Sequence, residues 1–296
     1  LKNANDYGLK IENYTKDFKA VIKRSRNVAS GMSKGVNFLM KKNKIDVING
    51  YGKIKSGKKV EVKKDDGEII DIQGNNIIIA TGAKSRILQN LPQDGKKIIG
   101  YREAMTLDYQ PKKIIIVGSG AIGIEFAYFY NTMGSEVTII EYQDRLVPQE
   151  DKEISKALET NFKKNGIKIF TSSELINSKI NGKSVSAIIK TANKEQTLSA
   201  DIILSAVGVK SNIDNIGLED VGIVSDNDKI IVDDFYQTNI PGYFAIGDIT
   251  KGQALAHVAS AEGILCVEKL AGLNTEPLDY ENCLLYTSDA ADESSS

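Results

Sequence analysis

A glycine-rich turn between a strand and a helix restricts the fold of this chain more than any other feature. Residues 118–123 read Gly-Ser-Gly-Ala-Ile-Gly and match the spacing G-x-G-x-x-G. They follow an apolar strand expected at 114–117 and open a helix expected at 122–133. A second strand, expected at 137–140, ends at Glu141. This βαβ succession, with an acid about twenty residues after the turn, is the context that a dinucleotide-binding turn requires. The sequence therefore predicts an α/β fold of Rossmann type here.

Each part of this turn has its own task in holding a dinucleotide. Gly118 permits the tight turn, Gly120 lets the backbone approach a pyrophosphate, and Gly123 lets the helix pack on the strand. The backbone N–H groups at the start of the helix then face the phosphates. Glu141 can accept hydrogen bonds from both ribose hydroxyls and would repel a 2′-phosphate, and the nearest arginine, Arg145, lies outside the immediate loop. NAD is thus predicted over NADP; the alternative is a glycine turn with a surface glutamate and no ligand.

Composition limits the class of protein. The 296 residues suffice for two domains, and 41% hydrophobic with 26% charged residues is typical of a soluble globular protein. A formal net charge of −1 gives no electrostatic argument for a nucleic-acid or membrane-surface partner. There is no apolar run near the roughly 20 residues that cross a bilayer and no export signal, so we expect a cytoplasmic protein. Cys266 and Cys283 are the only cysteines, which excludes a disulfide framework and a zinc site.

Hydrophobic periodicity predicts further elements on both sides of the turn. Residues 16–43 read as one helix with Thr15 as its N-cap and an apolar stripe facing a core. Short segments at 47–54, 59–62 and 69–72, separated by glycine turns, predict an antiparallel meander. The remaining expected elements are an apolar strand from residue 77 that ends at Thr81-Gly82, a helix at 151–164, strands at 167–170 and 202–206, and a helix at 255–270.

Four short motifs occur in an order that resembles a known family. Ile-Ala-Thr-Gly at 79–82 is followed by the turn at 118–125, Ala-Val-Gly at 206–208 and Ala-Ile-Gly-Asp at 245–248. The succession resembles the two-dinucleotide-binding flavoprotein disulfide reductases over nearly all of residues 1–282. The resemblance implies an α/β flavoprotein fold in which a Rossmann-like NAD domain is inserted into an incomplete FAD domain.

Within this family, residues 27–54, 141–148 and 150–154 are most similar to the dihydrolipoamide dehydrogenases. Mercuric reductase and NADH oxidase remain alternatives, separable mainly by cysteines outside this chain, while Glu141 argues against glutathione reductase, which uses NADP. A non-catalytic NAD-binding module is the alternative from a different functional class.

The resemblance also implies how the chain is divided. Residues 1–110 would be the FAD domain without its N-terminal βαβ part, 111–235 the NAD-binding domain, and 236–282 a further FAD and central segment. Residues 283–296 continue no pattern and resemble translated sequencing-adapter DNA, so we interpret them as an artefact and leave them out of the fold. The alternative is a genuine segment, because Tyr286-Thr287 loosely matches a motif of the family.

Several residues match family positions that contact FAD. Asp248 would accept a hydrogen bond from a ribityl hydroxyl, and Gly52 would meet the adenine through its backbone. Thr81 and Gly82 would line the flavin groove. Ala256 would offer its N–H to the flavin pyrimidine edge, where the helix N-terminus also stabilises negative charge on the reduced ring.

Other residues match positions near NAD or between the two cofactors. Leu175 and Gly208 match positions that touch NAD, and Glu125 matches a supporting glutamate that reaches toward the flavin. His257, the only histidine, matches a residue near the flavin, with a structural role favoured over proton transfer. The predicted cofactor-binding set is Gly52, Thr81, Gly82, Gly118, Ser119, Gly120, Ala121, Ile122, Gly123, Ile124, Glu125, Glu141, Leu175, Gly208, Asp248 and Ala256, with no metal ligands.

The family reaction also needs a redox-active Cys-x4-Cys pair and a His-Glu dyad, and this chain contains neither. The resemblance implies that the parent enzyme oxidises dihydrolipoamide, carried by the lipoyl domain of a 2-oxo-acid dehydrogenase complex, through a disulfide and FAD and reduces NAD. It also implies a homodimer. We expect the isolated chain to oxidise no dithiol and to dimerise weakly.

Overall fold

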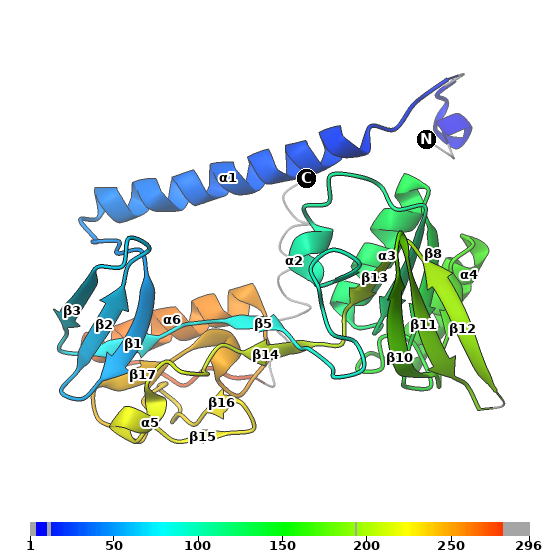
Figure 1. The fold of residues 1–296 in the computed structure, drawn as a ribbon. Helices are drawn as coiled ribbons and strands as arrows, with labels where there is room; N and C mark the ends of the chain where they lie inside the picture. The colour runs from blue at the N-terminus through cyan, green and yellow to red at the C-terminus, as the bar shows by residue number, and fades with distance from the viewer. Residues whose placement is uncertain (1–3, 11–12, 193, 281–296) are drawn as a thin grey trace. The chain divides into compact units, whose positions relative to one another are not determined.

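The computed structural model describes residues 4–10, 13–192 and 194–280 (Figure 1). Cys283 and the tail at 283–296 therefore lie outside the described residues. The chain forms two compact units: the first comprises Leu1–Asp46 and Ser85–Gly208, the second Val47–Lys84 and Val209–Ser296. Within the described ranges, no helix is both long and apolar enough to cross a membrane.

These boundaries differ from the limits at 110 and 235 expected from sequence. Residues after Ser85 join the first unit because Ile98 and Ile99 form an edge strand of its sheet. Residues after Val209 join the second unit because Ile213 and Ile230 are buried in its core. Sequence motifs mark the elements of a domain but do not show which neighbouring segments add to its edges.

The first unit is built on a five-stranded sheet whose strands are all parallel, which confirms the predicted α/β fold. The strand order places the turn strand β7 at the centre, as expected for a nucleotide-binding βαβ unit. In spatial order the strands are β6 (Ile98–Ile99), β13 (Ile202–Ser205), β7 (Lys113–Val117), β8 (Glu136–Ile140) and β9 (Lys168–Phe170).

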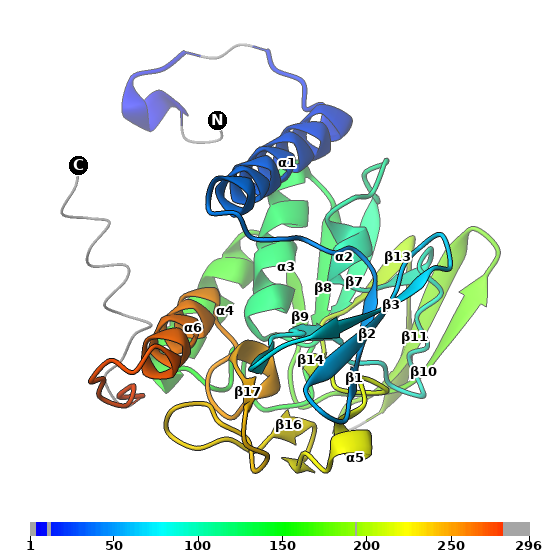
Figure 2. The same ribbon diagram turned by 90° about the vertical axis from the view of Figure 1, so that its left-hand side faces the viewer.

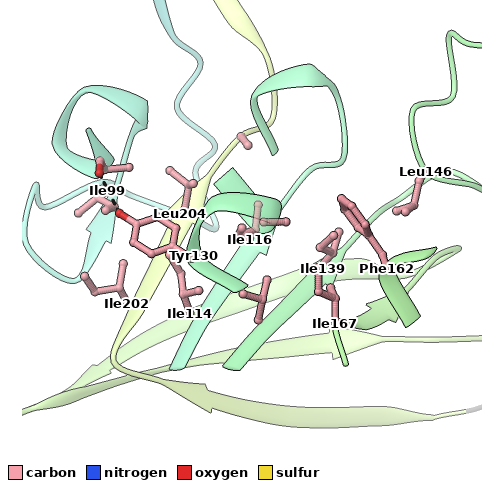
Figure 3. Close-up of a cluster of buried hydrophobic side chains, with 14 of the residues drawn as sticks. Ile99, Ile114, Ile116, Tyr130, Ile139, Leu146, Phe162, Ile167, Ile202 and Leu204 are labelled. Atoms are coloured by element: carbon pink, nitrogen blue, oxygen red, sulfur yellow. Dashed lines mark hydrogen bonds between the residues drawn. The ribbon is translucent and has the colours of Figure 1, made fainter. Parts of the chain in front are cut away.

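Both faces of this sheet are covered. Ile114 and Ile116 of β7 point into a core shared with α3 (Ala121–Met133) and α4 (Lys152–Lys164), where the Tyr130 hydroxyl donates to the Ala104 carbonyl at 2.8 Å (Figure 3). Ile115 and Val117 point to the opposite face. Alternate side chains of a strand leave on opposite faces, so a strand that is buried on both sides reads as the continuous apolar run seen here.

The opposite face is covered by a small antiparallel sheet, and Figure 2 shows the parallel strands lying between this layer and α3 and α4. Its strands are β10 (Glu174–Asn181), β11 (Ser184–Lys190) and β12 (Glu195–Ala200), paired in that order. A short helix, α2 (Tyr101–Ala104), follows β6. The three strands β10 to β12 thus form the second cover of the parallel sheet.

Helix α1 (Phe18–Lys42) corrects two predictions. Its N-cap is Asp17, whose side chain accepts a hydrogen bond from the Ala20 N–H at 3.0 Å, and not Thr15. The apolar stripe is also largely uncovered. Phe18 is buried against the aromatic rings of α3, but downstream stripe residues such as Met32 are exposed. Periodicity shows which side chains share a face, while another element must be present to bury that face.

The second unit contains the predicted antiparallel meander, formed by β1 (Tyr51–Lys55), β2 (Lys59–Lys63) and β3 (Ile69–Gln73). Its first strand begins at Tyr51, four residues later than expected. Strand β4 (Ile77–Ile79) pairs in parallel with β17 (Tyr243–Ala245), which leads into the one-turn helix η2 (Gly247–Ile249). The other elements of this unit are β14 (Val209–Ser211), α5 (Leu218–Val221), β15 (Ser225–Asp226), β16 (Lys229–Ile230) and α6 (Ala256–Leu270). Strand β5 (Ala83–Ser85) ends at the unit's boundary, and η1 (Ala4–Tyr7) belongs to the first unit.

Candidate functional site

The three glycines of the turn after β7 are required for different reasons. Gly118 has φ +97°, and a Cβ there would lie 2.3 Å from the Ala206 carbonyl oxygen. A Cβ on Gly123 would lie 2.1 Å from the Gly118 carbonyl oxygen. Gly120 is exposed, and a Cβ there would meet no atom within 4 Å. The fold itself therefore requires glycine at 118 and 123. Gly120 instead leaves the open space in which a ligand could approach the protein backbone closely.

Helix α3 begins in this open space and supplies hydrogen-bond donors. Gly120 is its N-cap in an extended conformation and provides no side-chain cap. The N–H groups of the first turn, beginning with Ala121, therefore have no partner within the helix. Uncapped N–H groups and the helix dipole together favour an anion such as a phosphate.

Ser119 departs from its predicted place among the phosphate-binding amides. Its side chain is completely buried, and its N–H donates to Glu141 Oε2 at 2.8 Å. Its hydroxyl donates to the same oxygen at 2.7 Å. In the structure the Glu141 carboxylate already uses this N–H, so the N–H groups left open to a ligand begin at the start of α3.

Glu141 is held rigidly by these bonds and one more. The Gln143 N–H donates to its Oε1 at 2.8 Å, and the residue is only 7% exposed. A carboxylate has roughly four acceptor positions, so three protein donors fix its orientation and leave capacity for a ligand hydroxyl. The sequence places an acid at the end of β8, and the tertiary structure adds the serine and backbone donors that orient it.

The other residues predicted on this side occupy different environments. Gly208 is exposed with φ +97° and follows β13, on the carboxyl edge of the sheet that carries the glycine turn. Glu125 on α3 is exposed. Ile122 and Ile124 pack partly against the core of the first unit. Leu175 is buried between the sheet layers, which argues for a packing role for its side chain.

In the second unit, Asp248 lies in η2 just beyond the carboxyl end of β17. Its carbonyl oxygen accepts hydrogen bonds from the Ser211 hydroxyl at 2.8 Å and from Lys229 Nζ. Within the part of the chain that the structure describes, no group donates to its carboxylate. The backbone of this aspartate is thus anchored while its side chain keeps its acceptors for a ligand.

Thr81 and Gly82 follow β4, the parallel neighbour of β17, so they lie at the same strand edge as Asp248. The Thr81 hydroxyl donates to the Asn212 carbonyl at 2.7 Å, and the Asn212 N–H donates to the Gly82 carbonyl at 2.8 Å. The segment at 211–212 therefore joins the two strand ends. No sequence signal marks Ser211 or Asn212 for this role, because it depends on strand pairing alone.

The remaining predicted residues of this unit are Gly52, Ala256 and His257, and all three are exposed. Gly52 lies in β1, whereas the neighbouring Gly50 is the sterically constrained glycine. It has φ +157°, and a Cβ there would lie 2.6 Å from the Lys63 carbonyl oxygen. Ala256 is the first residue of α6, where the helix N–H groups are again without helical partners.

These features define a class of protein: an α/β nucleotide-binding protein with a Rossmann-type turn in one unit and a second acidic strand-end turn in the other. The family model for pyridine nucleotide-disulphide oxidoreductases matches residues 7–263. The chain belongs to this family, as the order of its motifs predicted.

Relatives with known names narrow the comparison. The chain is 42% identical to the dihydrolipoyl dehydrogenase of Rhizobium etli over 94% of its own length and 62% of the relative. It is 39% identical to the Bacillus subtilis dihydrolipoyl dehydrogenase over 98% of its length and 64% of the relative. The chain thus spans about three-fifths of the length of the curated relatives that it matches.

Solved structures agree with this fold. LpdA from Mycobacterium tuberculosis superposes with a TM-score of 0.86 at 27% identity, covering 94% of this chain and 61% of that one. A flavoprotein disulfide reductase from Escherichia coli gives a TM-score of 0.78 over 87% of this chain and 58% of that one. At 24% identity, the second likeness concerns the fold alone.

Proposed function

We propose that this chain is the coenzyme-binding part of a dihydrolipoyl dehydrogenase that uses FAD and NAD. The observation that carries the proposal is the pairing of an open, uncapped glycine turn with a carboxylate fixed by Ser119 and Gln143. The names of the relatives support the substrate, dihydrolipoamide, and the lipoyl domain of a 2-oxo-acid dehydrogenase complex as its carrier. A homodimer of the whole protein is part of the same proposal.

In the first unit, the free N–H groups at the start of α3 hold the NAD pyrophosphate, and Glu141 accepts hydrogen bonds from the adenosine ribose. A 2′-phosphate would meet this buried negative charge. Arg145 offers no compensation, because its guanidinium donates to the Pro148 carbonyl at 2.6 Å and pairs with Asp144 at 3.2 Å. The site therefore favours NAD over NADP.

In the second unit, the residues at the strand edge fit FAD. Asp248 accepts from a ribityl hydroxyl, Thr81 and Gly82 border the groove, and the N-terminus of α6 at Ala256 faces the pyrimidine edge. Gly52 in β1 offers its backbone to the adenine. When bound, FAD supplies two-electron transfer between a dithiol and NAD, and the protein contributes binding and orientation.

This chain by itself has fewer of the reactive groups than the whole enzyme would need. The sequence contains two cysteines, of which Cys266 is buried on α6 and Cys283 lies outside the described residues. No Cys-x4-Cys pair is present to exchange with a dithiol. We therefore propose that the purified chain binds coenzyme and forms no NADH from dihydrolipoamide. Lipoamide-dependent NADH formation by this chain would contradict that statement.

Titration of the purified chain with NADH and NADPH, followed by nicotinamide fluorescence, tests the coenzyme site. The chain should bind NADH saturably and prefer it to NADPH. Glu141→Gln should weaken NADH binding about tenfold, because a hydrogen bond to a charged group contributes about 1.5–3 kcal/mol, and should raise NADPH affinity by removing the repulsion. Glu174→Gln, an exposed glutamate of the same unit, is the control. The proposed site is refuted if Glu141→Gln keeps the same preference for NADH over NADPH, or if the unsubstituted chain gives no saturable NADH signal.

A further inference from the structure

A buried carboxylate lies behind the turn that carries Asp248. Glu262, in the middle of α6, is 1% exposed although most of its neighbours on the buried face of the helix are apolar. The buried residues Val258, Glu262, Leu265 and Cys266 fall on one helical stripe. An ionisable group on a core stripe is costly to bury unless it is fully hydrogen-bonded, so its partners show what it does.

Both oxygens of this carboxylate have donors. Oε2 accepts from the Gly247 N–H at 2.5 Å, and Oε1 accepts from the Tyr280 hydroxyl at 2.7 Å. The hydroxyls of Tyr280 and Tyr236 lie 3.0 Å apart and share a further hydrogen bond. Partial burial raises the pKa of Tyr280, and its hydrogen bond to Glu262 raises it further, so this phenol remains a donor at neutral pH.

The bond to Gly247 acts at a point where the backbone takes a left-handed conformation. Gly247 has φ +74°, and a Cβ there would lie 3.3 Å from the Ala259 Cβ on α6. Its carbonyl oxygen accepts from the N–H and the hydroxyl of Thr250, each at 2.9 Å. The next residue is Asp248, whose own carbonyl is held by Ser211. The backbone groups of the turn are therefore held by other residues of the protein, and the carboxylate of Asp248 is the group left for a ligand.

We propose that Glu262 is a positioning residue for FAD: its carboxylate, held by Tyr280, fixes the Gly247 turn and so aims Asp248 at the ribityl chain. The proposal rests on the proposed function, because FAD binding at Asp248 is part of that function. Glu262 itself is too deeply buried to touch the cofactor, and it acts through the backbone N–H of Gly247. A charge-assisted bond to that N–H holds the turn more firmly than a neutral acceptor would.

Two measurements on the purified full chain test this role: hydrogen exchange of the Gly247 amide, and FAD affinity from flavin fluorescence anisotropy. Glu262→Ala should speed exchange at Gly247 and weaken FAD binding, each by about tenfold, because one charge-assisted hydrogen bond is lost. Glu262→Gln retains an acceptor oxygen and should show smaller changes in both. Asp248→Asn should weaken FAD binding while leaving Gly247 exchange unchanged, which separates the ligand contact from its support.

Controls make each outcome decisive. Glu268→Gln alters a glutamate of the same helix outside this cluster and should change neither measurement. If Glu262→Ala does not fold, Tyr280→Phe and Glu262→Gln carry the test, since Tyr280 is 40% exposed and both changes preserve shape. NADH titration of each variant should match the parent. Unchanged Gly247 exchange, or faster exchange with unaltered FAD affinity, overturns the role of Glu262 alone. If the unsubstituted chain binds NADH but no FAD, the flavin part of the proposed function is refuted, and this inference with it.

Discussion

Replacing Ser119 by alanine removes one hydrogen bond from the predicted ribose-binding carboxylate without touching the coenzyme. The serine hydroxyl is fully buried and lies 2.7 Å from Glu141 Oε2. Alanine keeps the backbone N–H that donates to the same oxygen at 2.8 Å, and Gln143 keeps its bond to Oε1. The variant therefore loosens Glu141 while leaving it charged and in place.

The size of the effect follows from these contacts. A hydrogen bond to a charged group contributes about 1.5–3 kcal/mol, and ordering a glutamate side chain costs about 1.5–2 kcal/mol. Two of the three protein donors remain, so only part of that ordering has to occur when the coenzyme binds. We expect NADH binding to weaken by about 1–2 kcal/mol, which is about a 5- to 30-fold rise in Kd. The free energy of unfolding should fall by about 1–2 kcal/mol, because the buried carboxylate loses a donor.

Fluorescence titration with NADH and NADPH measures both affinity and preference, and urea unfolding measures stability. The preference for NADH should narrow in Ser119→Ala, because a carboxylate with fewer restraints can turn away from a 2′-phosphate. Ser173→Ala is the matched control, since this buried serine donates its hydroxyl to the Thr171 carbonyl and not to Glu141. If Ser119→Ala keeps both NADH affinity and coenzyme preference within about twofold of the parent, the pre-orientation argument is wrong.

Three further outcomes are expected. Gly120→Ala should unfold at the same urea concentration as the unsubstituted chain and yet bind NADH weakly. Gly123→Ala should lose at least about 2 kcal/mol of stability, because only this variant places a Cβ against backbone atoms. Equal unfolding midpoints for the two variants would contradict this reasoning. Tyr130→Phe should cost about 1–2 kcal/mol in urea unfolding, since the buried Ala104 carbonyl loses its donor, and an unchanged midpoint would refute that loss. Lys168, more than Lys113, lowers the pKa of Glu136 below its ordinary value of 4.5, so the stability from this pair is present above that pH and is lost as pH falls below it. Glu136 is 41% exposed, so Glu136→Gln should remove no more than about 0.5 kcal/mol of this acid dependence, as read from unfolding midpoints between pH 5 and pH 3; a steeper acid dependence in the variant would contradict the sign.

Local sequence patterns predicted the central βαβ unit closely. The turn at 118–123 needs glycines at fixed spacing, and the structure shows Gly118 and Gly123 in backbone contacts that exclude any side chain. The apolar run before the turn is buried on both faces of a parallel sheet, as a continuous run indicates. Turn geometry and burial periodicity act over a few residues, so they can be read without knowing the rest of the fold.

The same reasoning failed where the outcome depended on a distant segment. The stripe on α1 has a correct helical period, but Phe18 alone among its residues is buried. The limits of the two compact units differ from the limits at 110 and 235, because β6 joins the sheet through pairing with β13, more than a hundred positions away in sequence. Periodicity shows which side chains of a helix share a face, but not which other element packs against that face.

For the candidate site, the sequence by itself determined the chemical groups: a glycine turn, Glu141 at a strand end, and Asp248 at another. Only the tertiary structure decided how they are held. Ser119 donates two hydrogen bonds to the Glu141 carboxylate, and Glu262 accepts one from the N–H of Gly247, the residue before Asp248. The physical reason is range: backbone conformation follows from neighbours in sequence, whereas a buried hydrogen bond requires two groups that only the folded chain brings within 3 Å of each other.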